Sequence, residues 1–252
     1  MPDPSTPPAA PVTLVFGATG GIGRAVVARA AARGARLVLA ARTADALATL
    51  AHETGALAVP TDATDAAAVQ AAVQAALDAH GRLDAAVCLV GSILLKPAHL
   101  TSPDEFATTI ALNLTTAFNV VRSAARAMMA TGGSIVLASS AVARVGLVNH
   151  EAIAAAKAGV VGLALSAAAT YAARGVRVNA VAPGLVETPL AARVLSSEAG
   201  RQQSASMHAL GRIGQPGDVA EAIDWLLDGA RSSWVTGQVI GVDGGLGTLR
   251  PR

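Results

Sequence analysis

The sequence predicts a single α/β domain, in which helices cover both faces of a doubly wound parallel sheet of about seven strands. The first observation behind this prediction is an alternation along the chain. Short runs rich in Val, Leu and Ile are followed by long Ala-rich stretches of helical period. The second is composition, because 52% apolar and 14% charged residues over 252 positions favour a large core and exclude a disordered chain.

Seven short apolar runs are predicted strands, because they are rich in strand-forming residues and too short for domain-spanning helices. In order, they are Val12–Phe16, Arg36–Ala40, Ala56–Pro60, Ala85–Val90, Ser134–Ser139, Val176–Val181 and Val239–Val242. The Ala-rich stretches between them are the predicted helices, covering residues 22–33, 43–54, 65–80, 103–130, 149–173 and 217–229. Strand, helix, strand in repetition gives right-handed crossovers, which make neighbouring strands parallel.

The ends of the domain and one internal segment have their own patterns. Residues 1–11, MPDPSTPPAAP, are Pro-rich and lack both the basic start and the apolar core of a signal peptide, so a disordered lead is predicted. Residues 12–252 show no change of composition and are predicted to form one domain. Within it, residues 187–214 have weak periodicity and many small or polar side chains. They are predicted to be a mobile loop or helical lid over the substrate.

Charge and cysteine content limit the partners that we expect. The 19 basic residues are scattered against 17 acidic ones, so no basic run favours nucleic acid. No stretch of about 18 strongly apolar residues favours a membrane span. The single cysteine, Cys88, cannot form an internal disulfide or a metal cluster, which favours a reducing, cytoplasmic location and no metal. Because charge is sparse, we expect part of the apolar surface to be buried between subunits.

A glycine-rich turn follows the first predicted strand and precedes the first predicted helix. In such a turn, glycines let the backbone approach a pyrophosphate that rests on the positive end of the helix. The position in an alternating β/α chain therefore predicts a dinucleotide site, against the alternative of a glycine cluster without a ligand. The residues predicted to line it are Gly17, Thr19, Gly21, Ile22 and Gly23.

The end of the second predicted strand indicates which dinucleotide binds. It reads Leu39-Ala40-Ala41-Arg42-Thr43, without the acid that would hold a ribose 2′-hydroxyl group. Arg42 instead offers a charged fork to a 2′-phosphate, so this turn, with Thr43, predicts NADP(H) rather than NAD(H). The alternative is that Arg42 is a solvated surface charge.

Further motifs run through the rest of the chain, from Thr61-Asp62-Ala63 to a C-terminal Val242-Asp243-Gly244-Gly245. Between them lie Asn113-Leu114, Ser139-Ser140 after a strand, and a segment from Arg177 to Gly184 that is followed by Thr188. With the glycine-rich turn, these motifs resemble the short-chain dehydrogenase/reductase family from Thr13 to Gly245. The resemblance implies a Rossmann fold and a nicotinamide dinucleotide as cofactor.

The resemblance also implies roles for single residues. Asp62 and Ala63 would contact the adenine, and Gly91, Pro183, Gly184, Val186 and Thr188 would lie along the cofactor. Asn113, Ser140 and Lys157 would belong to the catalytic set, with Lys157 also holding the nicotinamide ribose.

The sequence departs from the family at the catalytic centre. The family has a tyrosine four residues before its lysine, but here that residue is Ile153, which can neither give nor accept a proton. The only tyrosine, Tyr171, lies 14 residues after Lys157, on the order of 21 Å along the helix, and cannot substitute for it. The family's Asn-Asn-Ala-Gly after the fourth strand is also reduced here to Gly91, following Cys88-Leu89-Val90.

His150 is the candidate replacement for the missing proton donor. It lies seven residues before Lys157, and residues seven apart on a helix fall within about 20° of one another. The same offset is found for the tyrosine in the enoyl reductase branch of the family that the chain resembles. The alternative is that Asn149-His150-Glu151 is simply a helix start, with Asn149 as the cap and Glu151 beside the positive first turn.

These observations predict an NADP(H)-dependent oxidoreductase that reduces a C=O, C=C or C=N bond of a small organic substrate. Ser140 and His150 would bind or protonate the substrate oxygen, and Lys157 would orient the cofactor. The family resemblance also implies a homodimer or homotetramer built on the helices at 103–130 and 149–173. The alternative, favoured by Ile153, is a catalytically impaired pseudoenzyme that pairs with a homologue in a hetero-oligomer or senses NADP(H).

Overall fold

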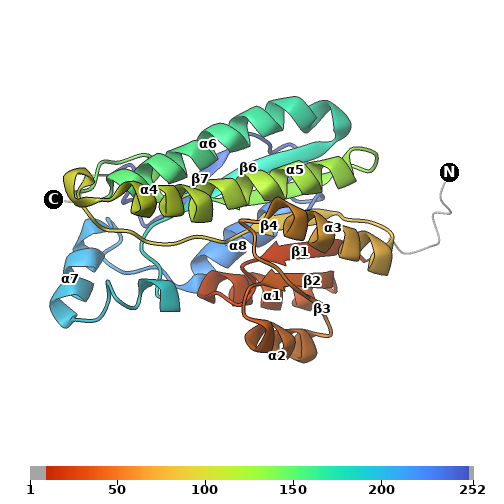
Figure 1. Cartoon of the computed structure of the whole chain (residues 1–252), viewed down its shortest axis with the longest axis horizontal. Coiled ribbons are helices and arrows are strands. Elements are labelled where there is room, and N and C mark those ends of the chain that lie inside the picture. The colour runs from red at the N-terminus through yellow and green to blue at the C-terminus, as the bar shows by residue number, and fades with distance from the viewer. Residues whose placement is uncertain (1–9, 250–252) are drawn as a thin grey trace.

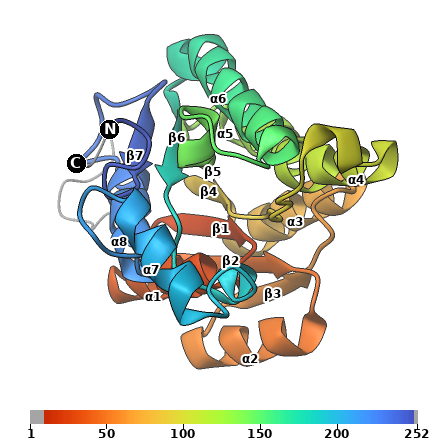
Figure 2. The same cartoon turned by 90° about the vertical axis from the view of Figure 1, so that its left-hand side faces the viewer.

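The computed structural model describes residues 10–249, which form a seven-stranded sheet of order β3-β2-β1-β4-β5-β6-β7 (Figures 1 and 2). Every neighbouring pair of strands is parallel. The strands are β1 (Val12–Phe16), β2 (Arg36–Ala41), β3 (Leu57–Pro60), β4 (Ala85–Cys88), β5 (Gly133–Ala138), β6 (Val176–Pro183) and β7 (Val239–Val242). The strand order reverses between β1 and β4, which is where ligands bind in doubly wound sheets. The predicted fold class is confirmed. The predicted disordered lead falls largely outside the described residues.

Helices cover both faces of the sheet, as Figure 2 shows. One layer contains α1 (Gly21–Ala32), α2 (Ala44–Thr54) and α8 (Pro216–Leu227). The other contains α3 (Ala66–His80), α4 (Pro103–Ile110), α5 (Thr116–Met128) and α6 (Glu151–Tyr171). A further helix, α7 (Glu198–Met207), lies apart from both layers. Short 3-10 turns cover Ala98–Leu100, Ala141–Ala143, Ala172–Arg174 and Pro189–Ala191.

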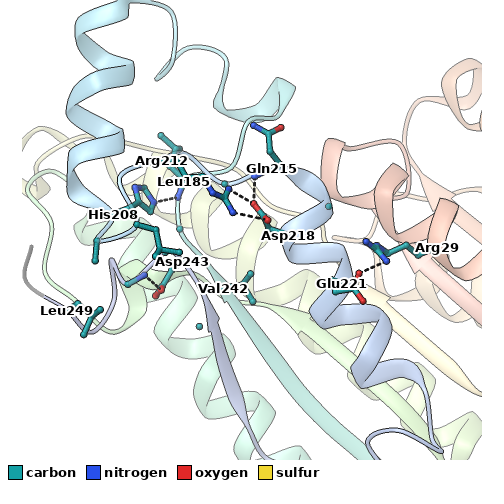
Figure 3. Close-up of a pocket in the computed structure, with 18 residues that line it drawn as sticks. Arg29, Leu185, His208, Arg212, Gln215, Asp218, Glu221, Val242, Asp243 and Leu249 are labelled. Atoms are coloured by element: carbon teal, nitrogen blue, oxygen red, sulfur yellow. Dashed lines mark hydrogen bonds and ion pairs between the residues drawn. The ribbon is translucent and has the colours of Figure 1, made fainter.

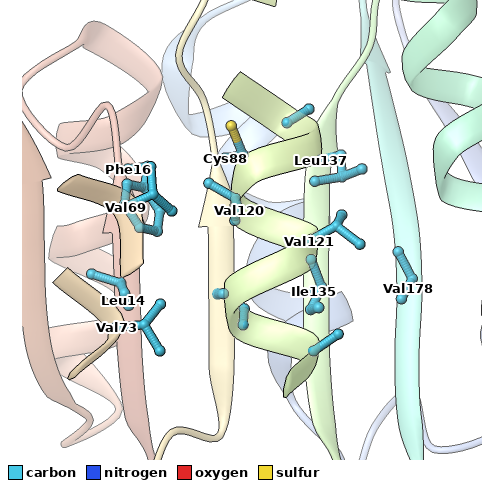
Figure 4. Packing of buried hydrophobic residues seen from close by; sticks show 14 of the residues in the cluster. Leu14, Phe16, Val69, Val73, Cys88, Val120, Val121, Ile135, Leu137 and Val178 are labelled. Carbon is cyan, nitrogen blue, oxygen red and sulfur yellow. The ribbon is translucent and has the colours of Figure 1, made fainter. Parts of the chain in front are cut away.

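Alternating side chains of the central strands build a separate core on each face of the sheet. Leu14 and Phe16 of β1 pack with Val69 and Val73 of α3, whereas Val15 belongs to the core on the α1 and α8 side (Figure 4). Both faces are buried, so β1 and β4 are apolar at every position but one. This packing makes the carboxyl ends of the strands a rigid edge on which loops can hold functional groups.

The helix predicted at 103–130 is interrupted in the structure. Residues Ala111–Thr115 form a π-helical turn between α4 and α5, with Asn113 buried at its centre. The Asn113 side chain donates to the carbonyl of Thr109 and accepts from the backbone N–H of Ser92, so it ties this turn to the loop after β4. Such turns inside helices are frequent at functional sites.

The start of α6 differs from the prediction that Asn149 caps it. The N-cap residue is His150, whose side chain makes no capping bond, while Asn149 has a left-handed backbone with φ of 63°. Asparagine tolerates this conformation better than most residues, and the Asn149 carbonyl accepts from the N–H of Lys96. Asn149 therefore serves the turn before the helix, and Glu151 lies in the first turn as predicted.

One helical stretch, Glu151–Arg174, is long and apolar enough by composition to cross a membrane, with a mean hydropathy of 1.7. In this fold it packs against β6, and Val160, Ala164 and Ala167 belong to the same buried cluster as β4 and β5. The apolar character of α6 is thus partly explained by its place on the sheet. Its exposed apolar side chains, such as Leu165, remain available for a protein interface.

Candidate active site

The glycine-rich turn is packed so closely that side chains would not fit. A Cβ atom on Gly23 would lie 2.2 Å from the Gly17 carbonyl oxygen, and Gly17 itself has a φ of +80°. Gly20 is the N-cap of α1 without a side-chain cap, and no acidic residue occupies the first turn. The backbone N–H groups at this helix start are therefore open to an anion, which fits the pyrophosphate of a dinucleotide. Thr19 and Ile22 lie in the same turn.

Arg42 and Asp62 come together at the carboxyl ends of β2 and β3. The Asp62 carboxylate accepts from the backbone N–H and the hydroxyl of Thr64, and these bonds, with the nearby charge of Arg42, lower its pKa. Arg42 is exposed and makes no hydrogen bond or ion pair among residues 10–249, and neighbouring Thr43 is exposed as well. The guanidinium of Arg42 is thus free to meet an anionic group.

Asn119, a buried asparagine that was not predicted from the sequence, holds the loop after β3 in place. Asn119 of α5 is 4% exposed, and its side chain donates to the carbonyls of Ala63 and Thr64. It pins the loop that carries Asp62 against the α5 layer. The signal was present, because Asn119 is a polar residue on the apolar face of a predicted core helix.

A second polar cluster joins the loop after β4 to the π-helical turn. Asn113 also donates to the hydroxyl of Ser92, a residue that was not predicted to take part. A Cβ on Gly91 would lie 2.8 Å from Asn113 Oδ1 and 3.4 Å from Lys157 Nζ. Gly91 therefore lets the Asn113 amide and the Lys157 ammonium approach the same backbone segment.

Lys157 is the buried charge at the centre of the site. It is 8% exposed, and its Nζ donates to the carbonyl of Ala138 at 2.8 Å. Burial lowers the pKa of Lys157 from 10.5 to about 8, because desolvation penalises the ammonium. Ser139, which was not predicted, donates from its hydroxyl to the Lys157 carbonyl and joins the end of β5 to α6.

Ser140, His150 and Ile153 line one small cavity of about 190 Å³, here called the Ser140 cavity. The remaining residues that line it are Ile93, Leu95, Ala141, Val142, Leu147, Gly184, Leu185, Val194, Ser204, Met207, His208 and Leu246. The Ser140 hydroxyl donates to the carbonyl of Pro183 and accepts from the N–H of Val142, both at 3.4 Å. These are long contacts, so the hydroxyl is free to bond a ligand in the cavity.

The hydrogen bond of His150 fixes which ring nitrogen carries the proton. Its Nδ1 lies 2.7 Å from the carbonyl oxygen of Val148, and because a carbonyl only accepts, Nδ1 must donate. In the neutral ring, Nε2 is then left with a lone pair. His150 and Ile153 share the wall of this cavity, whereas Lys157, the residue seven positions after His150 that was predicted to lie on the same helix face, is not among the lining residues. Tyr171 packs against the core near the far end of α6.

The segment predicted as a lid contains α7 and folds over the glycine-rich turn. A Cβ atom on Gly21 would lie 2.7 Å from the Cγ2 atom of Thr188, so the Thr188 side chain packs against the glycine-rich turn. Val186 is buried and pairs with Gly214, and the carboxylate of Glu187 binds Arg201 and Gln215. Of the predicted residues here, Pro183 is the last residue of β6, Gly184 lines the Ser140 cavity, and Thr188 contacts the glycine-rich turn.

A larger hollow of about 790 Å³ shares Leu185 and His208 with the Ser140 cavity; Figure 3 shows the residues that line this hollow. Arg212 binds Asp218, Arg29 binds Glu221, and the Nε2 atom of His208 accepts from the N–H of Leu185. His208 Nδ1 donates to the Ser204 carbonyl, so both ring nitrogens are used. His208 is thus a structural residue that holds the lid to the loop after β6, and it has no free nitrogen for catalysis.

Comparison with known proteins gives the family. The sequence pattern of the family described as enoyl-(acyl carrier protein) reductase matches residues 17–247. A cis-4-hydroxycyclohexanecarboxylate dehydrogenase from Sinomonas cyclohexanicum is 41% identical over 93% of this chain and 95% of its own. A short-chain type dehydrogenase/reductase from Mycobacterium ulcerans is 35% identical, with a TM-score of 0.90 over 96% of this chain and 91% of its own.

This chain belongs to the short-chain dehydrogenase/reductase family. It is an oxidoreductase of that family, whose members bind a nicotinamide cofactor. A solved structure of an actinorhodin polyketide ketoreductase with NADPH is also similar, with a TM-score of 0.90 and 30% identity over 95% of this chain and 98% of its own. Four residues before Lys157 this chain has Ile153, so an aliphatic side chain occupies that part of the Ser140 cavity.

Proposed function

We propose that this chain is an NADP(H)-dependent dehydrogenase that oxidises a secondary alcohol and reduces the corresponding ketone. The observation that carries this proposal is the Ser140 cavity, in which a free hydroxyl and an oriented imidazole share one wall beside Ile153. We take C–OH and C=O as the reacting pair, rather than C=C or C=N. The relative named cis-4-hydroxycyclohexanecarboxylate dehydrogenase supports this choice and makes cyclic secondary alcohols the first class to test.

The residues present fit NADP(H). The tight glycine turn and the open start of α1 suit a pyrophosphate, and the free guanidinium of Arg42 suits a 2′-phosphate. When bound, the nicotinamide supplies or accepts the hydride. Lys157 would hold the nicotinamide ribose, with its ammonium anchored on the Ala138 carbonyl, and Asn113 and Gly91 would keep that ammonium in place.

His150 replaces the missing tyrosine in this proposal. Because Nδ1 donates to the Val148 carbonyl, Nε2 can accept the proton of an alcohol held by the Ser140 hydroxyl. The imidazolium then returns the proton to the ketone oxygen in the reverse direction. A neutral ring with this tautomer cannot donate from Nε2, so the geometry favours the base in alcohol oxidation.

The proposal is tested with purified protein, NADP⁺ and a panel of cyclic and open-chain secondary alcohols, by following the absorbance of reduced nicotinamide. Turnover of at least one alcohol is expected, and Ser140→Ala should lower kcat/KM about 10-fold or more because one hydrogen bond to the reacting oxygen is lost. No turnover of any alcohol or of the corresponding ketones with NADPH would contradict the proposal.

Ile153 favours a second candidate function, a pseudoenzyme that binds NADP(H) and pairs with a homologue or senses the cofactor. Tight binding of NADPH without turnover would support this candidate. In that case Ile153→Tyr, which places a hydroxyl in the cavity beside Ser140, should create measurable ketone reduction.

We further propose a homodimer or homotetramer in the cytoplasm, without nucleic acid, metal or membrane partners. Phe118 of α5 and Leu165 of α6 are 52% and 48% exposed, and such side chains are typical of a protein interface. Cys88 is buried and free, which is compatible with a reducing compartment.

A further inference from the structure

The lining of the Ser140 cavity carries information about the substrate. No Asp, Glu, Lys or Arg side chain of the described residues lines it. Its polar side chains are Ser140, His150, Ser204 and His208, and the two ring nitrogens of His208 are already bonded. All the other lining residues are apolar or glycine.

Three cationic side chains from neighbouring segments, Arg144, Lys157 and Arg201, are not among the residues that line this cavity. Arg144 is exposed and its Nη1 lies beside Gly241, 3.3 Å from the position of a Cβ there. Lys157 is buried on the Ala138 carbonyl, and Arg201 of α7 pairs with Glu187. While the His150 ring is neutral, a carboxylate in the Ser140 cavity would therefore lose its hydration without gaining a cationic partner among the lining residues.

The orientation of His150 adds a repulsive contact for an anion. With the proton on Nδ1, the neutral ring presents only a lone pair at Nε2, which accepts from a hydroxyl but not from a carboxylate. The polar groups that can bond a ligand, the Ser140 hydroxyl and His150 Nε2, match one hydroxyl or carbonyl oxygen. The apolar remainder matches a hydrocarbon body.

The volume limits the size of that body. At about 190 Å³, the cavity is smaller than the roughly 300–1,000 Å³ that is typical of pockets for drug-sized ligands. Val194 and Met207 of the lid, Leu185 of the loop after β6, and Ile93 and Leu95 of the loop after β4 line its walls. A long acyl chain or a carrier-bound substrate would have to displace these walls.

Resting on the proposed function, we infer that the substrate is a compact, uncharged alcohol or ketone with an apolar body, and that the Ser140 cavity excludes carboxylates. The selecting feature is the absence of a cation from the wall formed by the described residues. An arginine placed in that wall should therefore change the preference.

The test is calorimetric titration of the NADP⁺-loaded protein with two ketones of equal heavy-atom number, 4-isopropylcyclohexanone and 4-oxocyclohexanecarboxylate. Ketones do not react with the oxidised cofactor, so the titration reports binding alone. The uncharged ketone should bind about 30-fold or more tightly than the anion, because an unpaired buried charge costs on the order of 2 kcal/mol or more. Equal affinities, tighter binding of the anion, or no binding of either ketone would overturn the inference.

A gain-of-function variant tests the inference with one ketone, so the difference in shape between the two ketones cannot affect the result. Leu147 lines the cavity from the loop before α6 and has no role in the proposed chemistry. Leu147→Arg should tighten binding of 4-oxocyclohexanecarboxylate at least 10-fold, whereas the matched Leu147→Met should not. An arginine variant with the affinity of the wild type would overturn the inference. Failure of the proposed function is recognised separately, as absence of turnover in a protein that keeps the binding preference.

Discussion

Lys157 shows at the scale of one residue how the fold prepares a charge for function. Its side chain runs from α6 to the end of β5, where the buried ammonium donates to the Ala138 carbonyl, and desolvation lowers its pKa to about 8. Burying such a group costs stability while it is charged. This cost is offset if the ammonium, fixed beside Gly91 in the loop after β4, holds a polar part of the cofactor.

The lowered pKa of Lys157 gives a prediction about pH. Between about 8 and 10.5, the unfolded chain binds a proton at Lys157 that the folded chain has lost, so this group makes stability rise with pH. Relative to Lys157→Met, the free energy of unfolding of the wild type should increase by up to about 3 kcal/mol across this range. Urea unfolding of both proteins at several pH values measures it. A constant difference would show that Lys157 has an ordinary pKa.

Arg42 gives the prediction about cofactor choice. Arg42→Ala should weaken the binding of NADPH about 10- to 100-fold and leave the binding of NADH nearly unchanged, because only NADPH has the 2′-phosphate that the guanidinium would bind. Calorimetric titration with both cofactors measures the effect. Arg36→Ala is the matched control, since Arg36 is exposed at the opposite end of β2. Equal losses for NADPH and NADH would contradict the assigned contact.

At the scale of elements, the sequence predicted strands and helices well but missed what tertiary contacts decide. β1 and β7 match their predicted bounds because apolar runs and turn residues are local signals. The π-helical turn at Asn113 was missed because it depends on Ser92, which is 21 residues away. Asn149 was expected to cap α6, but the turn before that helix requires a left-handed residue. The sequence does not distinguish a loop from a helical lid at residues 187–214 because the apolar period there is weak, and the structure shows the helix α7.

The lid gives a prediction about substrate binding. Glu187 ties the segment after β6 to Arg201 of α7 and to Gln215 before α8. Glu187→Ala should raise KM several-fold by loosening the lid, while stability changes by no more than about 0.5 kcal/mol because these bonds are exposed. Steady-state kinetics and thermal unfolding measure both. Glu198→Ala, which removes a bond confined to α7, is the control and should leave KM unchanged. If Glu187→Ala and Glu198→Ala change KM to the same extent, the bonds of Glu187 do not hold the lid for substrate binding.

At the scale of the whole molecule, the two helical layers are unequal. No large apolar side chain of α1, α2 or α8 is exposed, whereas α5 and α6 leave Phe118 and Leu165 exposed. An exposed apolar face of this kind is unfavourable in a monomer. It supports self-association through α5 and α6.

This asymmetry predicts the effect of interface charges. The double variant Phe118→Asp, Leu165→Asp should shift the mass in solution toward the monomer, because it would bury unpaired carboxylates in the interface. Light scattering coupled to size-exclusion chromatography measures the mass. Leu57→Asp on β3, at the edge of the sheet, is the control and should keep the assembly of the wild type. An unchanged mass in the double variant would exclude these helices as the interface.

The proposed reaction requires His150 to move the proton in place of a tyrosine. The most direct measurement is kcat for NADP⁺-dependent alcohol oxidation by His150→Ala, with exposed His99→Ala as the control. The account predicts a fall of about 10²- to 10⁴-fold for His150→Ala, an unchanged dissociation constant for NADP⁺, and wild-type rates for His99→Ala. A His150→Ala enzyme with the kcat of the wild type would contradict it.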